Sequence, residues 1–244
     1  MELEGYISDG NGGLKQFIRG RIPPCNDAGV CYNLDEGRKS MSSIIVASNK
    51  EICTVASDSR NIKNNIINDT YKKIFTFPDK KLIIGVAGQS TFMIDGCLRE
   101  ICDFLPEMVN KTNTSDWEDF LLNITDELRV KLSIDTAINF VCGYIKNGEI
   151  YSTGVSCTFR DEMPSNTSKT KELHASYAGV RHIDLSTISM ELIEKDPIAF
   201  AKNVVKFDMT VEEMASKQFG TTPCVGGDIK CVSLDKEGNI RTNL

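Results

Sequence analysis

The pattern of apolar and polar positions along the chain predicts groups of consecutive strands separated by groups of consecutive helices. Four early stretches are rich in β-branched residues: 43–48, 52–57, 71–77 and 82–87. Asn49-Lys50-Glu51 separates the first two as a short turn, which predicts a hairpin, and Pro78-Asp79-Lys80 separates the other two. We therefore expect four strands at the start of the folded domain.

Helical periodicity follows these strands. Over residues 90–105 and 115–132 the apolar residues recur at helical spacing, and Thr114 or Ser115 is a suitable helix start. Strands are predicted again at 137–146, 150–155, 157–160 and 173–178, with a polar loop over 161–171. We expect later helices at 185–195, 197–205 and 211–218, then a strand at 228–234 and a short last strand.

Two further features refine this plan. Thr210 and Glu213 have the spacing of a capping box, which predicts a helix start between the last two helices. Residues 1–41 mix polar and Gly-rich sequence with Pro23-Pro24, so we expect a loosely structured leader before a single domain over 42–244.

The order of these blocks indicates a fold class. Helices that come in blocks cover the faces of sheets rather than crossing between parallel strands. The sequence therefore predicts an α+β fold, a four-layer αββα sandwich in which two antiparallel sheets carry a helix layer outside each.

Charge and composition narrow the partners. The 244 residues carry a formal net charge of −6 and no basic stripe, which argues against nucleic acid as a partner. No run of eighteen apolar residues occurs and the first twenty residues do not resemble a signal peptide, so we expect a cytoplasmic protein without membrane attachment. Nine cysteines, an odd number, are then expected to be reduced thiols.

The chain lacks the sequence motifs of several common kinds of active site. His174 and His182 are the only histidines, and neither stands in a context such as G-x-S-x-G. The run Gly85 to Ser90 lacks the Lys-Ser/Thr ending of a phosphate loop. We expect no metal site and no cofactor.

Four segments, in order and in spacing, resemble the front half of proteasome β-type subunits and bacterial proteasome-like peptidases. They are Ser42-Ser43-Ile44-Ile45-Val46, Val55-Ala56-Ser57-Asp58-Ser59-Arg60, Thr70-Tyr71-Lys72-Lys73-Ile74 and Gly85-Val86-Ala87-Gly88. The later run Val225 to Ile229 is similar to the family's final core strand, so the resemblance spans about Ser42 to Ile240. It implies an N-terminal nucleophile hydrolase with the αββα fold, assembled as rings around a chamber.

The resemblance also implies a catalytic set. Ser42 falls at the nucleophile position, where the family usually has Thr, and its own α-amine, with a pKa of about 7.7–8.0, would serve as general base. Lys73 would favour loss of a proton at the nucleophile, Asp58 would hold Lys73 in place and charged, and Gly88 would offer a backbone N–H to the oxyanion. The same resemblance assigns substrate binding to Ser43, Asn61 and Ala87.

The chain departs from the family at two places. Met41 precedes Ser42 where processed members have Gly; either the chain cuts itself there, or Met41 acts as a start whose removal exposes Ser42. The Asp and two Ser residues that assist the nucleophile in relatives align near Thr222, Val225 and Ala178, and Ser176 or Thr222 could substitute by hydrogen bonding.

Three functions stay open. The first is a proteasome-like peptidase acting on peptides or unfolded proteins, as a homo-oligomeric ring that an ATPase unfoldase could feed. The second is a noncatalytic β-like ring subunit, and the third an N-terminal nucleophile amidohydrolase on a small amide. Asp58, Arg60 and Lys73 could also form a purely structural ion-pair cluster at strand ends.

Overall fold

The computed structural model describes residues 2–8, 14–21, 42–63, 66–134, 136–170, 173–179 and 190–242. Most of its strands form two five-stranded antiparallel sheets, with orders β13-β12-β11-β8-β7 and β14-β3-β4-β15-β16. The first sheet consists of β7 (Ile74–Phe77), β8 (Leu82–Gly88), β11 (Ala137–Lys146), β12 (Glu149–Thr158) and β13 (Ser165–Thr170). The second consists of β3 (Ser43–Ser48), β4 (Ile52–Ser57), β14 (His174–Gly179), β15 (Lys230–Asp235) and β16 (Ile240–Thr242).

The hairpin β3–β4 forms at the predicted residues and lies at the centre of the second sheet. Every residue of β3 is buried, because one face of the strand packs on the first sheet and the other on a helix. Ile44 and Val46 meet Ile83 and Val141 between the sheets, whereas Ile45 faces the helix. A strand covered on both faces loses the polar alternation of a half-exposed strand.

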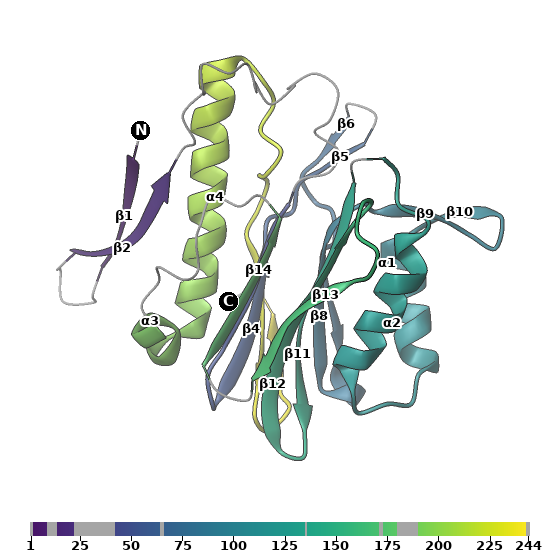
Figure 1. Cartoon of the computed structure of the whole chain (residues 1–244). Coiled ribbons are helices and arrows are strands. Elements are labelled where there is room, and N and C mark those ends of the chain that lie inside the picture. Colours follow the sequence, from purple (N-terminus) through teal and green to yellow (C-terminus); the bar gives the residue numbers. More distant parts are fainter. Residues whose placement is uncertain are drawn as a thin grey trace.

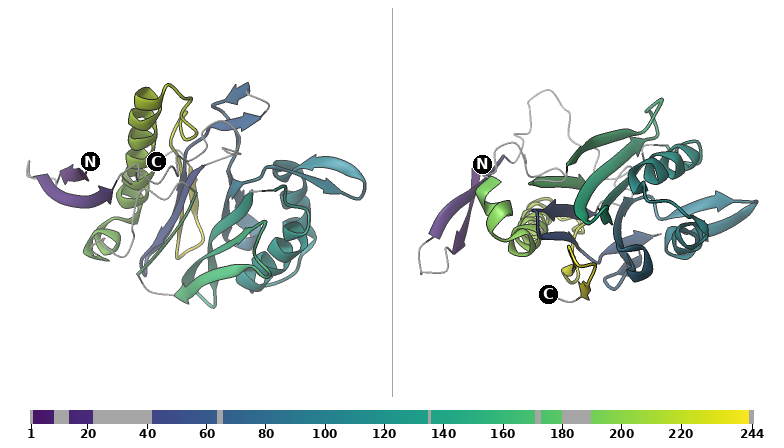
Figure 2. Two further views of the ribbon diagram at one scale, coloured as in Figure 1. Left: turned by 45° about the horizontal axis from the view of Figure 1, so that its top comes forward. Right: turned by 90° about the horizontal axis from the view of Figure 1, so that it is seen from below.

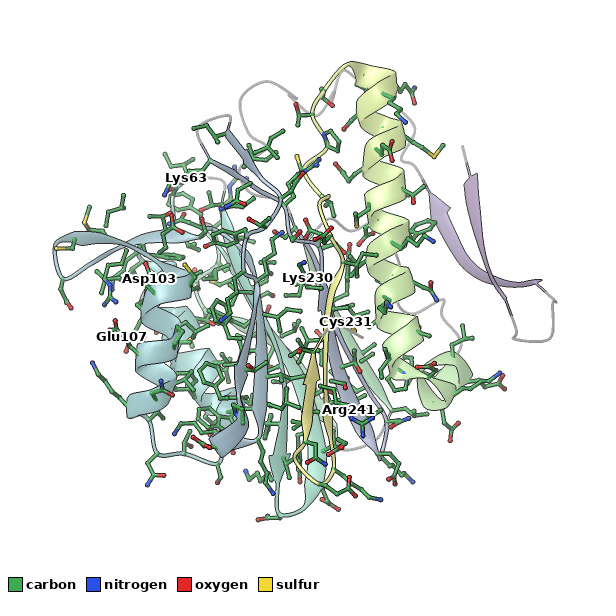
Figure 3. All side chains as sticks on the ribbon, turned by 180° about the vertical axis from the view of Figure 1, so that it is seen from behind. Lys63, Asp103, Glu107, Lys230, Cys231 and Arg241 are labelled. Carbon is green, nitrogen blue, oxygen red and sulfur yellow. The ribbon has the colours of Figure 1, made fainter. Side chains whose placement is uncertain are left out.

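Helices cover the outer faces of both sheets (Figure 1). α1 (Ile101–Lys111) and α2 (Trp117–Arg129) pack on the first sheet through an apolar cluster that includes Phe104 and Leu121. α4 (Pro197–Phe219) packs on the second sheet through an apolar cluster that includes Phe200 and Cys231 of β15. Figure 3 shows Cys231 on the strand beside α4. The protein is thus a mixed helix-and-strand structure of antiparallel sheets and few helices, compatible with an α+β sandwich.

The helix predicted over 90–105 is wrong in its first two thirds. Thr91–Ile94 and Cys97–Glu100 form an antiparallel hairpin, β9–β10, and α1 begins only at Ile101. Asp95 and Gly96 form the turn with φ of 50° and 76°, the left-handed conformation that a two-residue hairpin loop needs. The Asp-Gly turn signal therefore prevails over the helical spacing, and the hairpin extends away from the sheet in both views of Figure 2.

The helix start predicted at Thr210 is also wrong. α4 continues without interruption from Pro197 to Phe219, so the two predicted helices are one. The hydroxyl of Thr210 donates to the carbonyl oxygen of Lys206, 2.9 Å away, four residues earlier. A threonine bonded in this way belongs to a helix interior rather than to a cap.

Other differences concern short elements. The predicted polar loop over 161–171 contains β13. The segment predicted as a loose leader contains an antiparallel pair, β1 (Glu2–Ser8) with β2 (Leu14–Arg21). A further pair, β5 (Asn61–Lys63) with β6 (Ile66–Asn68), was not expected. α3 (Met190–Lys195) covers the end of the helix predicted over 185–195, whose first residues lie outside the described ones.

Within the described ranges, none of the helices has the length and apolar character needed to cross a bilayer.

A polar chain joins the two sheets at the end of β3 that is remote from Ser42. Oγ of Ser152, on β12, lies 2.6 Å from Oγ of Ser48 and 2.7 Å from Nδ1 of His174. His174 is the first residue of β14 and is buried, and this burial lowers its pKa from 6.5 to about 4. His174 is therefore a structural residue at a strand end. The other histidine, His182, lies outside the described residues.

This arrangement predicts acid destabilisation that depends on His174. The pKa of His174 is about 4 in the folded chain and 6.5 for an unperturbed histidine, as in the unfolded chain. Between these two pH values the unfolded chain therefore binds more protons than the folded chain. The stability that neutral His174 contributes is therefore fully present above pH 6.5 and is lost as the pH falls toward 4, by up to roughly 3 kcal/mol.

Urea unfolding of the wild type and of His174→Asn at pH 7.5 and pH 4.5 checks this expectation. The free energy of unfolding should fall more between the two pH values in the wild type than in the variant. Equal falls would show that the pKa of His174 is not lowered in the folded chain and that the imidazole is not buried as described.

Candidate active site

A small pocket brings together residues from four parts of the chain. Ser42 immediately precedes β3, Asn61 comes from β5, Lys73 from the segment before β7, and Ala87 and Gly88 from the end of β8. The other lining residues are Tyr71, Lys72, Val86, Gln89, Ser90 and Ile101. Five of the seven site residues predicted from the sequence therefore line one pocket, although up to 46 residues separate them in the chain.

Asp58 lies behind this pocket and is fully buried. Its Oδ1 accepts hydrogen bonds from Lys73 Nζ at 2.7 Å and from the backbone N–H of Ser43 at 3.0 Å. Its Oδ2 accepts from the backbone N–H groups of Gly226 at 3.1 Å and Arg60 at 3.2 Å. Four donors compensate the loss of water around the carboxylate and fix the relative positions of three distant chain segments.

Lys73 is almost fully buried, with 5% of its surface exposed. Burial lowers the pKa of the ammonium, and the neighbouring Asp58 raises it by a smaller amount, so that the net pKa lies below the usual value for lysine. The sequence predicts that Asp58 keeps Lys73 charged, and Asp58 acts in this direction while burial acts against it. The lysine therefore releases a proton more readily than a surface lysine does.

Gly88 ends β8 with φ of 102°, a conformation that side chains rarely allow. A Cβ atom there would overlap the carbonyl oxygen of Ala137, which itself accepts the N–H of Gln89 at 2.8 Å. The backbone at this wall of the pocket thus needs glycine on two counts, the torsion angle and the close approach of β11.

Arg60 braces the turn before β15 and does not line the pocket. Its guanidinium binds Asp69 through Nε at 2.6 Å and Nη2 at 2.9 Å, and Nη1 donates to the Pro223 carbonyl at 3.2 Å. Asp69 raises the pKa of Arg60 further through this pairing. Gly226 leaves room for the guanidinium, since a Cβ there would lie 2.6 Å from Cζ of Arg60. These contacts of Arg60 hold the turn in the position from which the Gly226 N–H donates to Asp58.

Ser43, predicted to bind substrate, has its side chain elsewhere. It is fully buried, and its hydroxyl donates to Oδ2 of Asp208 at 2.5 Å. The Tyr177 hydroxyl donates to the same oxygen at 2.6 Å. Asp208 and Tyr177 were not predicted from the sequence. The available signal was an acidic residue on the apolar face of a helix, four positions after Val204.

The positions aligned with the family's assisting groups, and the residues considered as substitutes for those groups, lie outside the pocket. Ser176, Ala178, Thr222 and Val225 are absent from its lining. Met41, whose bond to Ser42 decides whether a free amine exists, lies outside the described residues.

No group of three or more His, Cys, Asp or Glu side chains within the described residues could hold a metal ion. A scan against protein-family models and a search of curated proteins each found no match to the chain.

The buried ion pair predicts unequal costs for its two partners. Asp58→Ala leaves the Lys73 ammonium buried and three backbone N–H groups without their acceptor, so we expect a loss of about 3–5 kcal/mol. Lys73→Met leaves Asp58 bonded to those three N–H groups and should cost less, about 1–3 kcal/mol. Urea unfolding of both variants measures the difference, and a larger loss for Lys73→Met would contradict the central role of the carboxylate.

The close packing around Gly88 predicts that a larger residue there lowers the free energy of unfolding. Gly88→Ala adds both backbone strain and overlap with Ala137, and we expect it to cost at least about 2 kcal/mol. Gly96→Ala is the matched control, because Gly96 has φ of 76° but nothing within 4 Å of an added Cβ. The control should show only the strain of a left-handed residue, about 1–2 kcal/mol. Equal losses in urea unfolding would mean that the chain relaxes without cost around the methyl group added in Gly88→Ala.

Proposed function

We propose that the protein is a peptidase that cleaves peptide bonds with Ser42 as an N-terminal nucleophile, the α-amine of Ser42 being the general base. One observation carries the proposal: Ser42, Lys73 and Gly88 line the same pocket, and the Lys73 ammonium is buried against Asp58. A surface ion-pair cluster would not need a buried lysine that lines the same pocket as a serine, so this geometry favours catalysis over the purely structural alternative.

We propose further that the fold is the four-layer αββα sandwich of N-terminal nucleophile hydrolases. The support is the covering of two facing antiparallel sheets by helices on their outer faces, together with the entry of Ser42 directly into a central strand. In such an arrangement the nucleophile sits at the sheet end where the pocket opens.

The chemistry proceeds once the Met41–Ser42 bond is broken. The neutral α-amine takes the proton from the Ser42 hydroxyl as its oxygen attacks the substrate carbonyl carbon. The carbonyl oxygen becomes an oxyanion, which the Gly88 N–H would stabilise, and the resulting ammonium then gives its proton to the leaving amine. Water repeats the sequence on the acyl-enzyme and restores Ser42. The positive charge of Lys73, held beside Asp58, would favour the loss of the serine proton.

Peptides or unfolded proteins are the proposed substrates, in the cytoplasm, and a homo-oligomeric ring is the proposed assembly. Large apolar side chains are exposed on two projecting hairpins: Ile66 and Ile67 on β6, Met93 on β9 and Leu98 on β10. Exposed apolar groups on small hairpins commonly mediate contacts between protein chains. An ATPase unfoldase as a further partner rests on the family resemblance alone.

Two alternatives follow from the size of the pocket. Its enclosed space is about 10 Å³, roughly the room for one water molecule, and Ser42 is 4% exposed. A peptide side chain therefore needs the pocket to widen. The same observation favours a noncatalytic β-like ring subunit or, if the pocket opens only slightly, an amidohydrolase on a small amide.

The test of the proposal is the chain terminus together with covalent labelling. Intact mass of the purified, assembled protein should correspond to a chain that begins at Ser42. A serine-reactive β-lactone should add to Ser42, and we expect Lys73→Met to slow this labelling at least about 100-fold while the protein remains folded.

Ser42→Ala is the control for labelling, because it removes only the hydroxyl. A chain that retains Met1 in the assembled protein and does not react with the β-lactone would reject the peptidase and favour the noncatalytic subunit. Normal labelling of Lys73→Met would reject the role assigned to the lysine.

A further inference from the structure

The residue after the nucleophile is held at three points. The Ser43 N–H donates to Asp58 at 3.0 Å, and the Asp58 N–H donates to the Ser43 carbonyl at 3.1 Å. The third point is the side chain, whose hydroxyl donates to Asp208 of α4 at 2.5 Å. Two buried carboxylates from different layers of the molecule therefore fix one residue, and that residue is joined by a peptide bond to Ser42.

Asp208 occupies an otherwise apolar environment. It is fully buried on the face of α4 that packs on the second sheet, near the apolar residues Val204, Val205 and Val211. Its Oδ2 also accepts the Tyr177 hydroxyl at 2.6 Å, and Tyr177 stands on β14 opposite Ile45 of β3. A carboxylate in such surroundings is costly unless it is well bonded, and an apolar residue would dock the helix equally well.

We infer that Asp208, together with Tyr177, is a positioning residue for the nucleophile. It holds the Ser43 side chain, and through the shared backbone it sets the direction in which the Ser42 hydroxyl faces Lys73 and Gly88. The inference rests on the proposed function, and it assigns to α4 a task beyond covering the sheet. Displacements of a reacting group by about 1 Å can cost a hundredfold in rate, so such anchoring has a measurable effect.

The experiment compares three variants of the full-length protein by their reaction with the serine-reactive β-lactone. Asp208→Asn keeps the shape but removes the charge, and Ser43→Ala removes the hydroxyl that Asp208 binds. Glu118→Gln is the matched control, because Glu118 is also a buried carboxylate, bonded to Asn166 at 2.7 Å, but lies on α2 outside the first sheet.

We expect Asp208→Asn and Ser43→Ala each to lower the maximal acylation rate at least about tenfold, while the concentration for half-maximal rate changes less than about twofold. The double variant should be no slower than the slower single variant, because the two groups act as one unit. Glu118→Gln should lose stability without this change in rate. An unchanged rate in Asp208→Asn, or an equal loss in Glu118→Gln, would overturn the inference.

Backbone hydrogen exchange supplies a readout that does not require catalysis. In Asp208→Asn the amides of residues 43–45 should exchange at least about tenfold faster than in Glu118→Gln at matched global stability, because the anchor of the strand start is weakened. Absence of labelling in the wild type would reject the proposed function rather than the anchor. In that event, equal exchange in the two variants would overturn the anchor as well.

Discussion

The structure depends on one buried carboxylate, that of Asp58. Three of its four hydrogen-bond donors come from distant segments, namely the start of β3, the segment before β7 and the turn before β15, the last of which is 168 residues away in the chain; the fourth is the N–H of nearby Arg60. A carboxylate without water is tolerated only when such donors surround it, so the three distant segments must meet at Asp58 for the fold to be stable. The geometry of the pocket follows from this requirement.

The central strand β3 is anchored by polar groups at both ends and by apolar packing between them. At one end Ser43 binds Asp58 and Asp208, and at the other Ser48 joins the chain that leads through Ser152 to His174. Residues 44–47 are completely buried between the first sheet and α4. Hydrophobic burial is not directional, whereas these hydrogen bonds are, so the polar ends determine the register at which the sheets and helix meet.

The proposed chemistry is consistent with the groups that the pocket contains. No histidine is among the described residues that line the pocket. An N-terminal amine would serve as the base in place of a histidine side chain. Lys73 is the cation of the site, and its burial lowers the affinity for its proton. The narrowness of the pocket is the feature that most favours the alternatives, since a substrate can enter only if the pocket widens.

Local sequence patterns determined several of the central strands. β3, β4 and β11 form at the predicted residues because their β-branched content and turn residues agree with their environment. Ordered motifs also placed Ser42, Lys73 and Gly88 in one candidate site. Where two local signals compete, as helical spacing and the Asp95-Gly96 turn do within residues 90–105, the sequence alone predicts the wrong element.

Only the tertiary structure decided which distant polar groups meet. The bond from Ser43 to Asp208 joins residues 165 positions apart, and the packing of α4 on the second sheet creates it. Periodicity assigns Asp208 to a helix face, but the partner across the interface depends on how that face docks. The chain by itself thus determined its local elements and the order of its motifs, while the burial of Asp58 and Asp208 against particular donors arises from long-range packing that no short pattern encodes.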